Sequence, residues 1–207
     1  MKVALCVLSY KRYDLTAKTV AHNIANCHHE NIGLFVEDTF GVAKAHNNVL
    51  RRAMMEGYEG FVIMGNDILM PTGWLKAYVE AWSLEAGMIS FPVDPPMRNE
   101  KSFEQVIGNF FIGRNVVNTI GAFNEKFDPY GAIDLDYNRR CEAAGLRCFY
   151  LPNNLQYHIG GQHAHGNIYG FDKQEMVSKT WGLLYAPIEN IPLIDMVQFE
   201  GEEEPTQ

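Results

Sequence analysis

The sequence predicts an α/β domain whose central sheet is mixed but mostly parallel and is flanked by helices. Short apolar runs, such as residues 3–8 and 61–64, alternate with stretches whose apolar side chains recur at helical spacing, such as residues 42–55. The first kind is typical of buried strands in parallel sheets, and the second of amphipathic helices. Their alternation favours right-handed crossovers around one sheet. A chain of 207 residues forms one such core without needing a second domain.

The first part of the chain is expected to hold four strands and three helices. The strands are residues 3–8, 32–36, 61–64 and 88–91, and the helices are residues 15–25, 42–55 and 72–85. Asp14 is a candidate N-cap for the first helix, because its carboxylate can accept a hydrogen bond from an N–H of the first turn. Gly57 and Gly87 are expected to stop the second and third helices.

The pattern changes after residue 91. Residues 92–101 are rich in proline and are expected to form a loop, because Pro interrupts both helices and strands. A mixed or antiparallel strand is expected at 105–113, then a short helical turn at 114–120, a helix at 133–144, a strand at 147–151 and a last helix at 172–184. Residues 200–207 are acidic, which predicts a disordered tail.

The net charge of −8 says little about a partner, because much of it is concentrated near the end of the chain. Six acidic residues and no Lys or Arg follow Lys179, which leaves the remainder close to balance. No basic stripe of the kind that marks nucleic-acid-binding faces is visible. No segment has the pattern of a membrane span or of a signal peptide. The four cysteines form no CxxC pair, which favours reduced thiols in a cytoplasmic protein.

The first candidate site is Asp67, which follows the apolar run 61–64 within Gly65-Asn66-Asp67. Ligands of open α/β sheets bind outside the carboxyl ends of the strands, so this carboxylate can reach a substrate or a metal ion. The alternative is an Asn-Asp turn, in which Asp67 only accepts local backbone N–H groups. On these residues alone the two interpretations carry equal weight.

The second candidate is the pair Asp134 and Asp136 at the start of the helix expected at 133–144. Carboxylates there are stabilised by the helix dipole, and many serve only as caps. Residues i and i+2 point in different directions on a helix, so one general base is expected at most. Asp134 lies nearer the loop that contains Gly131 and is the better candidate base, whereas Asp136 is expected to brace the turn.

The third candidate is His158, which follows a strand-like segment and precedes two glycines that let backbone approach a ligand. His163 and His165 are expected to be loop residues. No cysteine pair and no H-x-x-x-H helix supports a zinc site.

Further polar residues stand where strands are expected to end. Ser9 and Tyr10 follow the first strand, Glu37 and Asp38 follow the second, and Asn47 lies on the next helix. All would line one edge of the sheet, although Glu37 can equally be a solvated loop residue and Asn47 a filler of a polar gap. Trp74 is expected to anchor the start of a helix by packing.

Several of these segments, taken in chain order, are similar to the motifs of one family. They are Leu8-Ser9-Tyr10-Lys11-Arg12, Glu37 or Asp38, Ala43-Lys44-Ala45-His46-Asn47, Gly65-Asn66-Asp67 with Pro71-Thr72-Gly73-Trp74-Leu75, residues 121–127, residues 130–136 and residues 157–161. Together they resemble the GT-A glycosyltransferases, especially the family-2 group, over about residues 3–165. The corresponding family motifs are Ser/Thr-Tyr-Asn-Arg, an acidic residue, Ala-Arg-Asn, Asp-x-Asp with Pro-Gly-Trp-Leu, Gly-Gly-Phe-Asp-Glu-x-Phe, Tyr-Gly-Glu-Asp-x-Asp-Leu and Tyr-His-x-Gly-Gly.

The resemblance implies a single GT-A-like domain over residues 1–199, with a donor half at 1–91 and an acceptor half at 92–199. It implies transfer of a sugar from a nucleotide-diphosphate sugar to an acceptor hydroxyl, assisted by Mn²⁺ or Mg²⁺, with inversion. Asp134 would then be the general base, Asp67 would be a metal ligand, and His158 would be a second metal ligand or a diphosphate contact. The donor would be held by seven residues, namely Ser9, Tyr10, Arg12, Glu37, Asp38, Asn47 and Asn66.

Two positions depart from the family pattern. Gly65 replaces the first Asp of Asp-x-Asp, which implies weak or dispensable metal use, and Ile133 replaces the Glu before the base. These departures keep two alternatives open: a catalytically silent nucleotide-sugar-binding protein, and a nucleotidyltransferase on a similar sheet. The acceptor also stays open among a saccharide, a lipid-linked intermediate, a protein side chain and a hydroxylated nucleobase.

Overall fold

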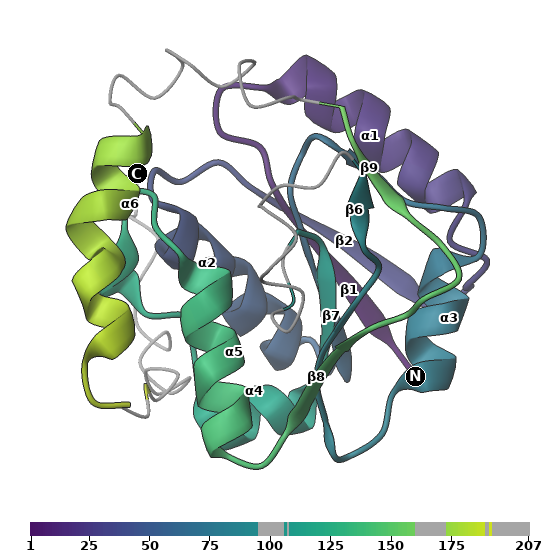
Figure 1. Ribbon diagram of the computed structural model, residues 1–207. Helices are drawn as coiled ribbons and strands as arrows, with labels where there is room; N and C mark the ends of the chain where they lie inside the picture. Colours follow the sequence, from purple (N-terminus) through teal and green to yellow (C-terminus); the bar gives the residue numbers. More distant parts are fainter. Residues whose placement is uncertain (95–105, 107, 160–172, 189–190, 192–207) are drawn as a thin grey trace, which may run out of the picture.

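The computed structural model describes residues 1–94, 106, 108–159, 173–188 and 191. The expected tail at 200–207, most of the proline-rich loop, and His163 and His165 lie outside the described residues. The described residues form helices and two sheets, and the helices lie on both sides of the larger sheet (Figure 1).

The larger sheet has six strands in the order β2-β1-β3-β7-β5-β8. They are β2 (Ile32–Glu37), β1 (Val3–Leu8), β3 (Gly60–Met64), β7 (Phe110–Gly113), β5 (Ala86–Ser90) and β8 (Arg147–Tyr150). β1 pairs in parallel with β2 and with β3, and β5 pairs in parallel with β8. β7 is antiparallel to both of its neighbours, β3 and β5. The expectation of a mixed, mostly parallel sheet is therefore confirmed.

A smaller sheet of three short strands lies at the carboxyl end of β3. Its order is β4 (Ile68–Leu69), β9 (Gln156–His158) and β6 (Val93–Asp94). β4 and β9 are antiparallel, with Ile68 opposite His158 and Leu69 opposite Tyr157. This pairing brings the segment after β3 beside a segment from far along the chain.

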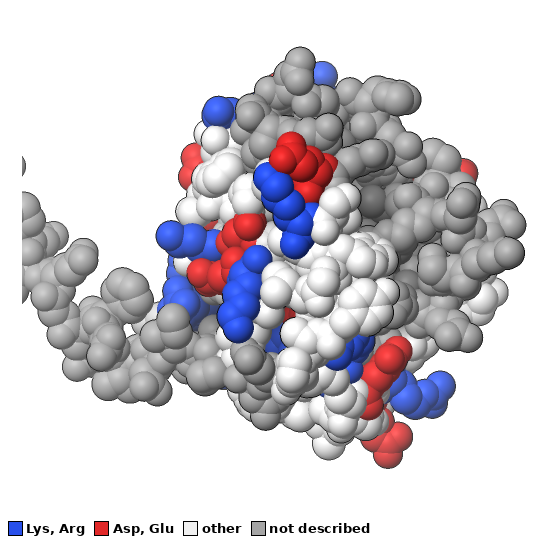
Figure 2. Space-filling view, turned by 60° about the vertical axis from the view of Figure 1, so that its left-hand side comes forward, with Lys and Arg blue, Asp and Glu red and all other residues white. Residues whose placement is uncertain are grey.

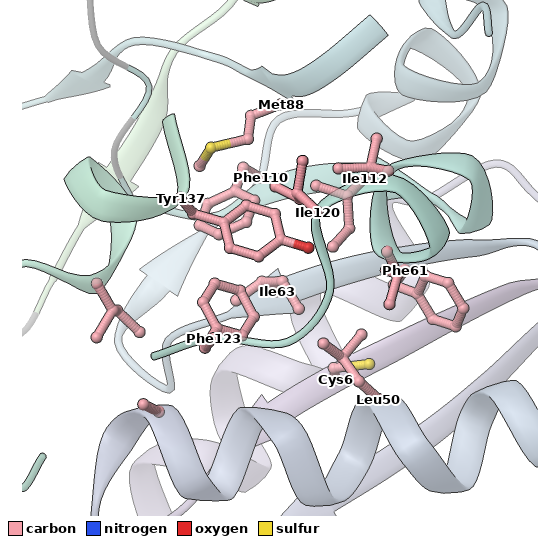
Figure 3. Packing of buried hydrophobic residues seen from close by; sticks show 14 of the residues in the cluster. Cys6, Leu50, Phe61, Ile63, Met88, Phe110, Ile112, Ile120, Phe123 and Tyr137 are labelled. Atoms are coloured by element: carbon pink, nitrogen blue, oxygen red, sulfur yellow. The ribbon is translucent and has the colours of Figure 1, made fainter. Parts of the chain in front are cut away.

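Helices cover both faces of the larger sheet because its strands are apolar on both faces. Along β1, Val3, Leu5 and Val7 pack in one core cluster, whereas Ala4 and Cys6 pack in the other, as the alternation of strand side chains requires. The first cluster is covered by α1 (Tyr13–Ala25) and α3 (Trp74–Ala81). The second is covered by α2 (Val42–Met55), α4 (Arg114–Ile120) and α5 (Ile133–Ala143). Figure 3 shows part of the second cluster, including Cys6 facing Leu50 of α2.

Most expected helices and strands are present, but several of them begin or end at other residues than expected. The expected Asp14 cap is wrong: α1 begins at Tyr13 with Arg12 at the N-cap, and Asp14 lies in the first turn. The helix expected at 72–85 is only α3, because Trp82 is already extended, and β5 begins at Ala86 instead of residue 88. The last expected helix divides into α6 (Lys173–Trp181) and the 3₁₀ turn η3 (Gly182–Tyr185). Trp74 is fully buried, which confirms its packing role.

Charges are mixed on the face shown in Figure 2, where Lys and Arg side chains lie beside Asp and Glu side chains in small groups. None of the helices in the described ranges is both long and apolar enough to cross a membrane.

Candidate active site

Asp67 lies in the turn that links β3 to β4, at the carboxyl end of the central strands. It is 5% exposed, and its backbone carbonyl accepts a hydrogen bond from Ile159 N–H at 2.8 Å. A second hydrogen bond holds the turn: Asn109 Oδ1 accepts from Gly65 N–H at 2.7 Å. The main chain of this turn is therefore fixed by two neighbouring segments.

His158 ends β9 and lies against Asp67. Its Nε2 is 3.3 Å from Asp67 Oδ2, and both side chains are less than a tenth exposed. The approach follows from the β4–β9 pairing, which sets Ile68 opposite His158. The structure thus brings together the two residues that the sequence proposes as metal ligands.

Arg12 is the third member of this group. Its Nη1 is 3.8 Å from the same oxygen, Asp67 Oδ2, and its side chain is 12% exposed. Arg12 stands between β1 and α1, so it reaches the carboxylate from the neighbouring parallel strand. We refer to Arg12, Asp67 and His158 as the Asp67 cluster.

A group of aromatic and acidic side chains follows the carboxyl ends of β1 and β2. The rings of Tyr10 and Phe40 are 5.5 Å apart between centroids, and Phe40 is about half exposed. Tyr13 Oη donates to Asp38 Oδ2 at 3.0 Å, and this hydrogen bond raises the pKa of the Tyr13 phenol. Exposed aromatic faces beside a carboxylate suit a nucleobase and its ribose, by stacking and hydrogen bonding respectively.

Three of the residues predicted to bind the nucleotide sugar make their polar contacts with other residues of the protein. Ser9 Oγ donates to Thr16 Oγ1 at 2.8 Å and is fully buried. Glu37 accepts hydrogen bonds from Thr39 and forms an ion pair with Arg52 at 3.4 Å. Both residues therefore hold the loops that follow β1 and β2, and a contact of either with a donor stays a prediction.

Asn47 is the third of these residues. Its Nδ2 donates to Phe123 O and to Glu125 Oε1, both at 2.9 Å, and its Oδ1 accepts from Phe123 N–H at 2.8 Å. It fastens α2 to the segment that precedes α5. Asn66, by contrast, belongs to the Asp67 turn, and its carbonyl accepts from Thr19 Oγ1 at 3.0 Å.

Asp134 and Asp136 differ in their surroundings. Asp136 is buried and forms an ion pair with Arg140 at 2.9 Å. Asp134 is partly exposed in the first turn of α5, where its Oδ1 accepts from Leu135 N–H at 3.0 Å. The structure therefore gives Asp136 a bracing contact and leaves part of the Asp134 side chain accessible.

The loop before α5 is attached to the start of α2 by an interaction that sequence reasoning missed. Asp128 accepts hydrogen bonds from Ala43 N–H at 2.7 Å and Lys44 N–H at 3.0 Å, and so caps α2 from a distant segment. Burial raises the pKa of the Asp128 carboxyl, and the two N–H groups oppose that rise. Because α2 starts just past β2, this contact holds the start of α5 at the same edge of the sheet as the Asp67 cluster.

Phe40 and Asn109 were also missed from the sequence. Phe40 had one available signal, its place directly after Glu37-Asp38-Thr39. Asn109 had none, because nothing local indicates that its side chain accepts from Gly65 while its N–H donates to Gln156 Oε1 at 3.1 Å. Asn109 thus joins the segment that carries Asp67 to the strand that carries His158.

No family model matches the chain, and no curated protein matches it in sequence. Solved structures do match. The catalytic domain of Drosophila β1,4-galactosyltransferase 7, in complex with xylobiose, has a TM-score of 0.69 at 16% identity, covering 94% of this chain and 83% of that one. The mannosyltransferase PcManGT from Pyrobaculum calidifontis, in complex with GDP-Man and Mn²⁺, has a TM-score of 0.59 at 15% identity, covering 78% and 58%.

A third match is GalNAc-T7 with UDP, GalNAc and Mn²⁺, with a TM-score of 0.64 at 10% identity, covering 89% of this chain and 50% of that one. The narrower resemblance to family 2 stays a prediction. At such identities a structural likeness is one of fold, and these three structures share the fold that the sequence motifs predict. The chain therefore has the GT-A fold of the glycosyltransferases.

Proposed function

We propose that this protein is a glycosyltransferase that moves a sugar from a nucleotide-diphosphate sugar to an acceptor hydroxyl. The observation that carries the proposal is the meeting of Asp67 and His158 at 3.3 Å, at the edge where ligands of α/β sheets bind. The structural neighbours support the same reaction class, since those named above are a galactosyltransferase, a mannosyltransferase and GalNAc-T7, the last two in complex with a nucleotide and Mn²⁺.

The donor would lie along residues 1–91, with its base near Tyr10, Phe40 and Asp38 and its diphosphate near Arg12 and Asn66. The proximity of these groups to one sheet edge supports this placement. Ser9, Glu37 and Asn47 would act by holding the loops in position. Residues 92–199 would form the acceptor side, because they contribute Asp134 and the loop that precedes it.

Asp67 and His158 also fit a divalent cation in donor type, since Mn²⁺ accepts both carboxylate oxygen and imidazole nitrogen. Within the described ranges no group of three or more His, Cys, Asp or Glu side chains gathers. Asp67 and His158 would be two of the ligands. A bound Mn²⁺ or Mg²⁺ would stabilise the negative charge that develops on the departing diphosphate.

Asp134 would be the general base. Its carboxylate takes the proton of the acceptor hydroxyl while the hydroxyl oxygen attacks the anomeric carbon. The bond from that carbon to the diphosphate oxygen breaks on the opposite side, so the anomeric configuration inverts. The carboxylate is suited to this role because it is partly exposed, whereas Asp136 is tied to Arg140. A positioned base of this kind contributes about 10²- to 10⁴-fold in rate.

The test is a donor screen followed by one substitution. Thermal unfolding with UDP- and GDP-sugars, with and without Mn²⁺, identifies a donor because a ligand that binds only the folded state raises the melting temperature. We then expect Asp134→Asn to lower the rate of donor hydrolysis or transfer by about 10²-fold or more and to leave the donor-induced thermal shift intact. Asp14→Asn is the matched control, because Asp14 also lies in the first turn of a helix, and it should leave the rate unchanged.

Gly65 and Ile133 favour a second candidate, a nucleotide-sugar-binding protein without transfer activity. That candidate predicts a thermal shift with nucleotide sugars, no turnover, and no difference between the parent protein and Asp134→Asn. A shift with nucleoside triphosphates alone would instead favour a nucleotidyltransferase. The four cysteines, all free within the structure, support the further proposal of a reducing, cytoplasmic location.

A further inference from the structure

The Asp67 cluster contains a guanidinium, that of Arg12, which cannot itself bind a metal ion. Asp67 Oδ2, the oxygen that would bind a metal ion, is approached by His158 Nε2 at 3.3 Å and by Arg12 Nη1 at 3.8 Å. All three side chains are nearly buried, so water screens the charges of the Asp67 carboxylate and the Arg12 guanidinium less than it would at the surface. The guanidinium is always charged, and it is therefore a fixed competitor for the carboxylate.

We propose that Arg12 is an exchanging partner of Asp67: it neutralises the carboxylate in the empty site and moves to the donor diphosphate when a divalent cation takes its place. The proposal rests on the proposed function, because it needs a donor that carries a diphosphate. It assigns to Arg12 the task of making metal binding and donor binding depend on each other.

Charge balance is the first argument. In the empty site the guanidinium of Arg12 offsets charge on the carboxylate of Asp67. A divalent cation beside Asp67 would add positive charge in a nearly buried place, which is unfavourable unless a counter-charge arrives. The diphosphate of a nucleotide sugar supplies that counter-charge, and a guanidinium binds phosphate oxygens through paired N–H groups. The metal ion alone should therefore bind weakly, and the metal ion with a nucleoside diphosphate should bind tightly.

The backbone of Arg12 supports an exchange that involves the side chain only. Its N–H donates to Ser9 O at 3.2 Å, and its carbonyl accepts from Thr16 N–H at 2.9 Å and from Thr16 Oγ1 at 2.9 Å. These contacts fix the main chain at the start of α1. The long side chain can then change its partner without any movement of the loop or the helix.

The test measures metal binding directly, by following the electron paramagnetic resonance signal of free Mn²⁺ during titration of the protein. Without nucleotide, we expect Arg12→Met to bind Mn²⁺ at least about ten-fold more tightly than the parent, because removing one positive charge about 5 Å from a divalent ion has an effect of that size even in a water-like dielectric. Arg12→Lys keeps the charge and should stay within about two-fold of the parent. Lys11→Met removes an exposed charge next in the chain and should also stay within about two-fold.

Saturating UDP or GDP gives the second readout. The nucleotide should tighten Mn²⁺ binding in the parent by more than it does in Arg12→Met, because coupling between two ligands is reciprocal and Arg12 carries part of it. Thermal unfolding checks that each variant is folded. Unchanged or weaker Mn²⁺ binding by folded Arg12→Met, or equal enhancement by nucleotide in both proteins, would overturn the exchange, as would the absence of Mn²⁺ binding to parent and variant alike. Sugar transfer by the parent is assayed separately, so a failure of the proposed function is distinguishable from a failure of the exchange.

Discussion

His46 should make this protein less stable in mild acid. The side chain lies on α2 and is 5% exposed, with its ring 5.3 Å from that of Phe123 between centroids. Its Nδ1 has no hydrogen-bond partner among the described residues. Burial without a compensating charge lowers the pKa of His46 from 6.5 to about 3, because the interior disfavours the imidazolium.

The sign of the effect follows from which state binds the proton. Between pH 6.5 and about 3 the unfolded chain protonates His46 and the folded protein does not. Acid in this window therefore favours unfolding, and the free energy of unfolding rises with pH until about pH 6.5. With about 1.4 kcal/mol for each pH unit, His46 alone should cost about 2 kcal/mol at pH 5 relative to pH 7.5.

His46→Met isolates this contribution. Methionine is similar in size, suits a helix and has no proton to bind, so the variant should be within about 1 kcal/mol of the parent at pH 7.5. Urea unfolding of both proteins at several pH values gives the difference in the free energy of unfolding, and other titrating groups cancel. That difference should shift by about 2 kcal/mol in favour of the variant between pH 7.5 and pH 5.

His28→Asn serves as the control, because His28 is exposed and Asn tolerates its positive φ. Its difference from the parent should stay constant with pH within about 0.5 kcal/mol. If the His46→Met difference were equally constant, the imidazole would be protonating in the folded protein, and the argument from burial would be wrong.

Two further predictions concern packing around the site. Asn109→Ala removes the acceptor of the Gly65 N–H and should lower the free energy of unfolding by about 2–3 kcal/mol and weaken Mn²⁺ binding in the titration; unchanged binding would contradict its positioning role. Gly87→Ala would place a Cβ 3.0 Å from Cys148 Sγ, and urea unfolding should show a loss of about 1–3 kcal/mol. Gly182→Ala, whose Cβ meets none of the described residues within 4 Å, is the matched control and should change stability by less than about 1 kcal/mol; equal losses in both variants would argue against crowding at Gly87.

Much of the fold could be predicted from the sequence, because buried strands and amphipathic helices leave different apolar periods. Residues 42–55 and 114–120 form helices over the bounds that the pattern predicts. The ends were harder. The N-cap of α1 is Arg12 and not Asp14, and α3 stops at Ala81 instead of continuing to residue 85. Such limits depend on how the next segment leaves the helix, which the local sequence does not specify.

Individual residues of the candidate site could be predicted from the sequence, but their arrangement in space could not. Asp67 and His158 each stand at a strand end, which is visible in the sequence, and only the antiparallel pairing of β4 with β9 brings them to 3.3 Å. Ser9 had the same signal as Tyr10, and Asn47 was expected on a helix near the same edge. The structure turns the polar atoms of both Ser9 and Asn47 inward. Direction into a core or toward a ligand is set by the neighbouring elements, so composition and spacing do not reveal it.

The sequence by itself therefore determined the alternation of strands and helices, the GT-A resemblance and the residue types available at the sheet edge. Only the tertiary structure decided which of these residues approach the same carboxylate oxygen, Asp67 Oδ2. Asp67 acquires both His158 and Arg12 because parallel β1 and β3 lie side by side while β9 returns against β4. Contacts between segments distant in the chain arise from packing and sheet pairing, which local periodicity does not encode.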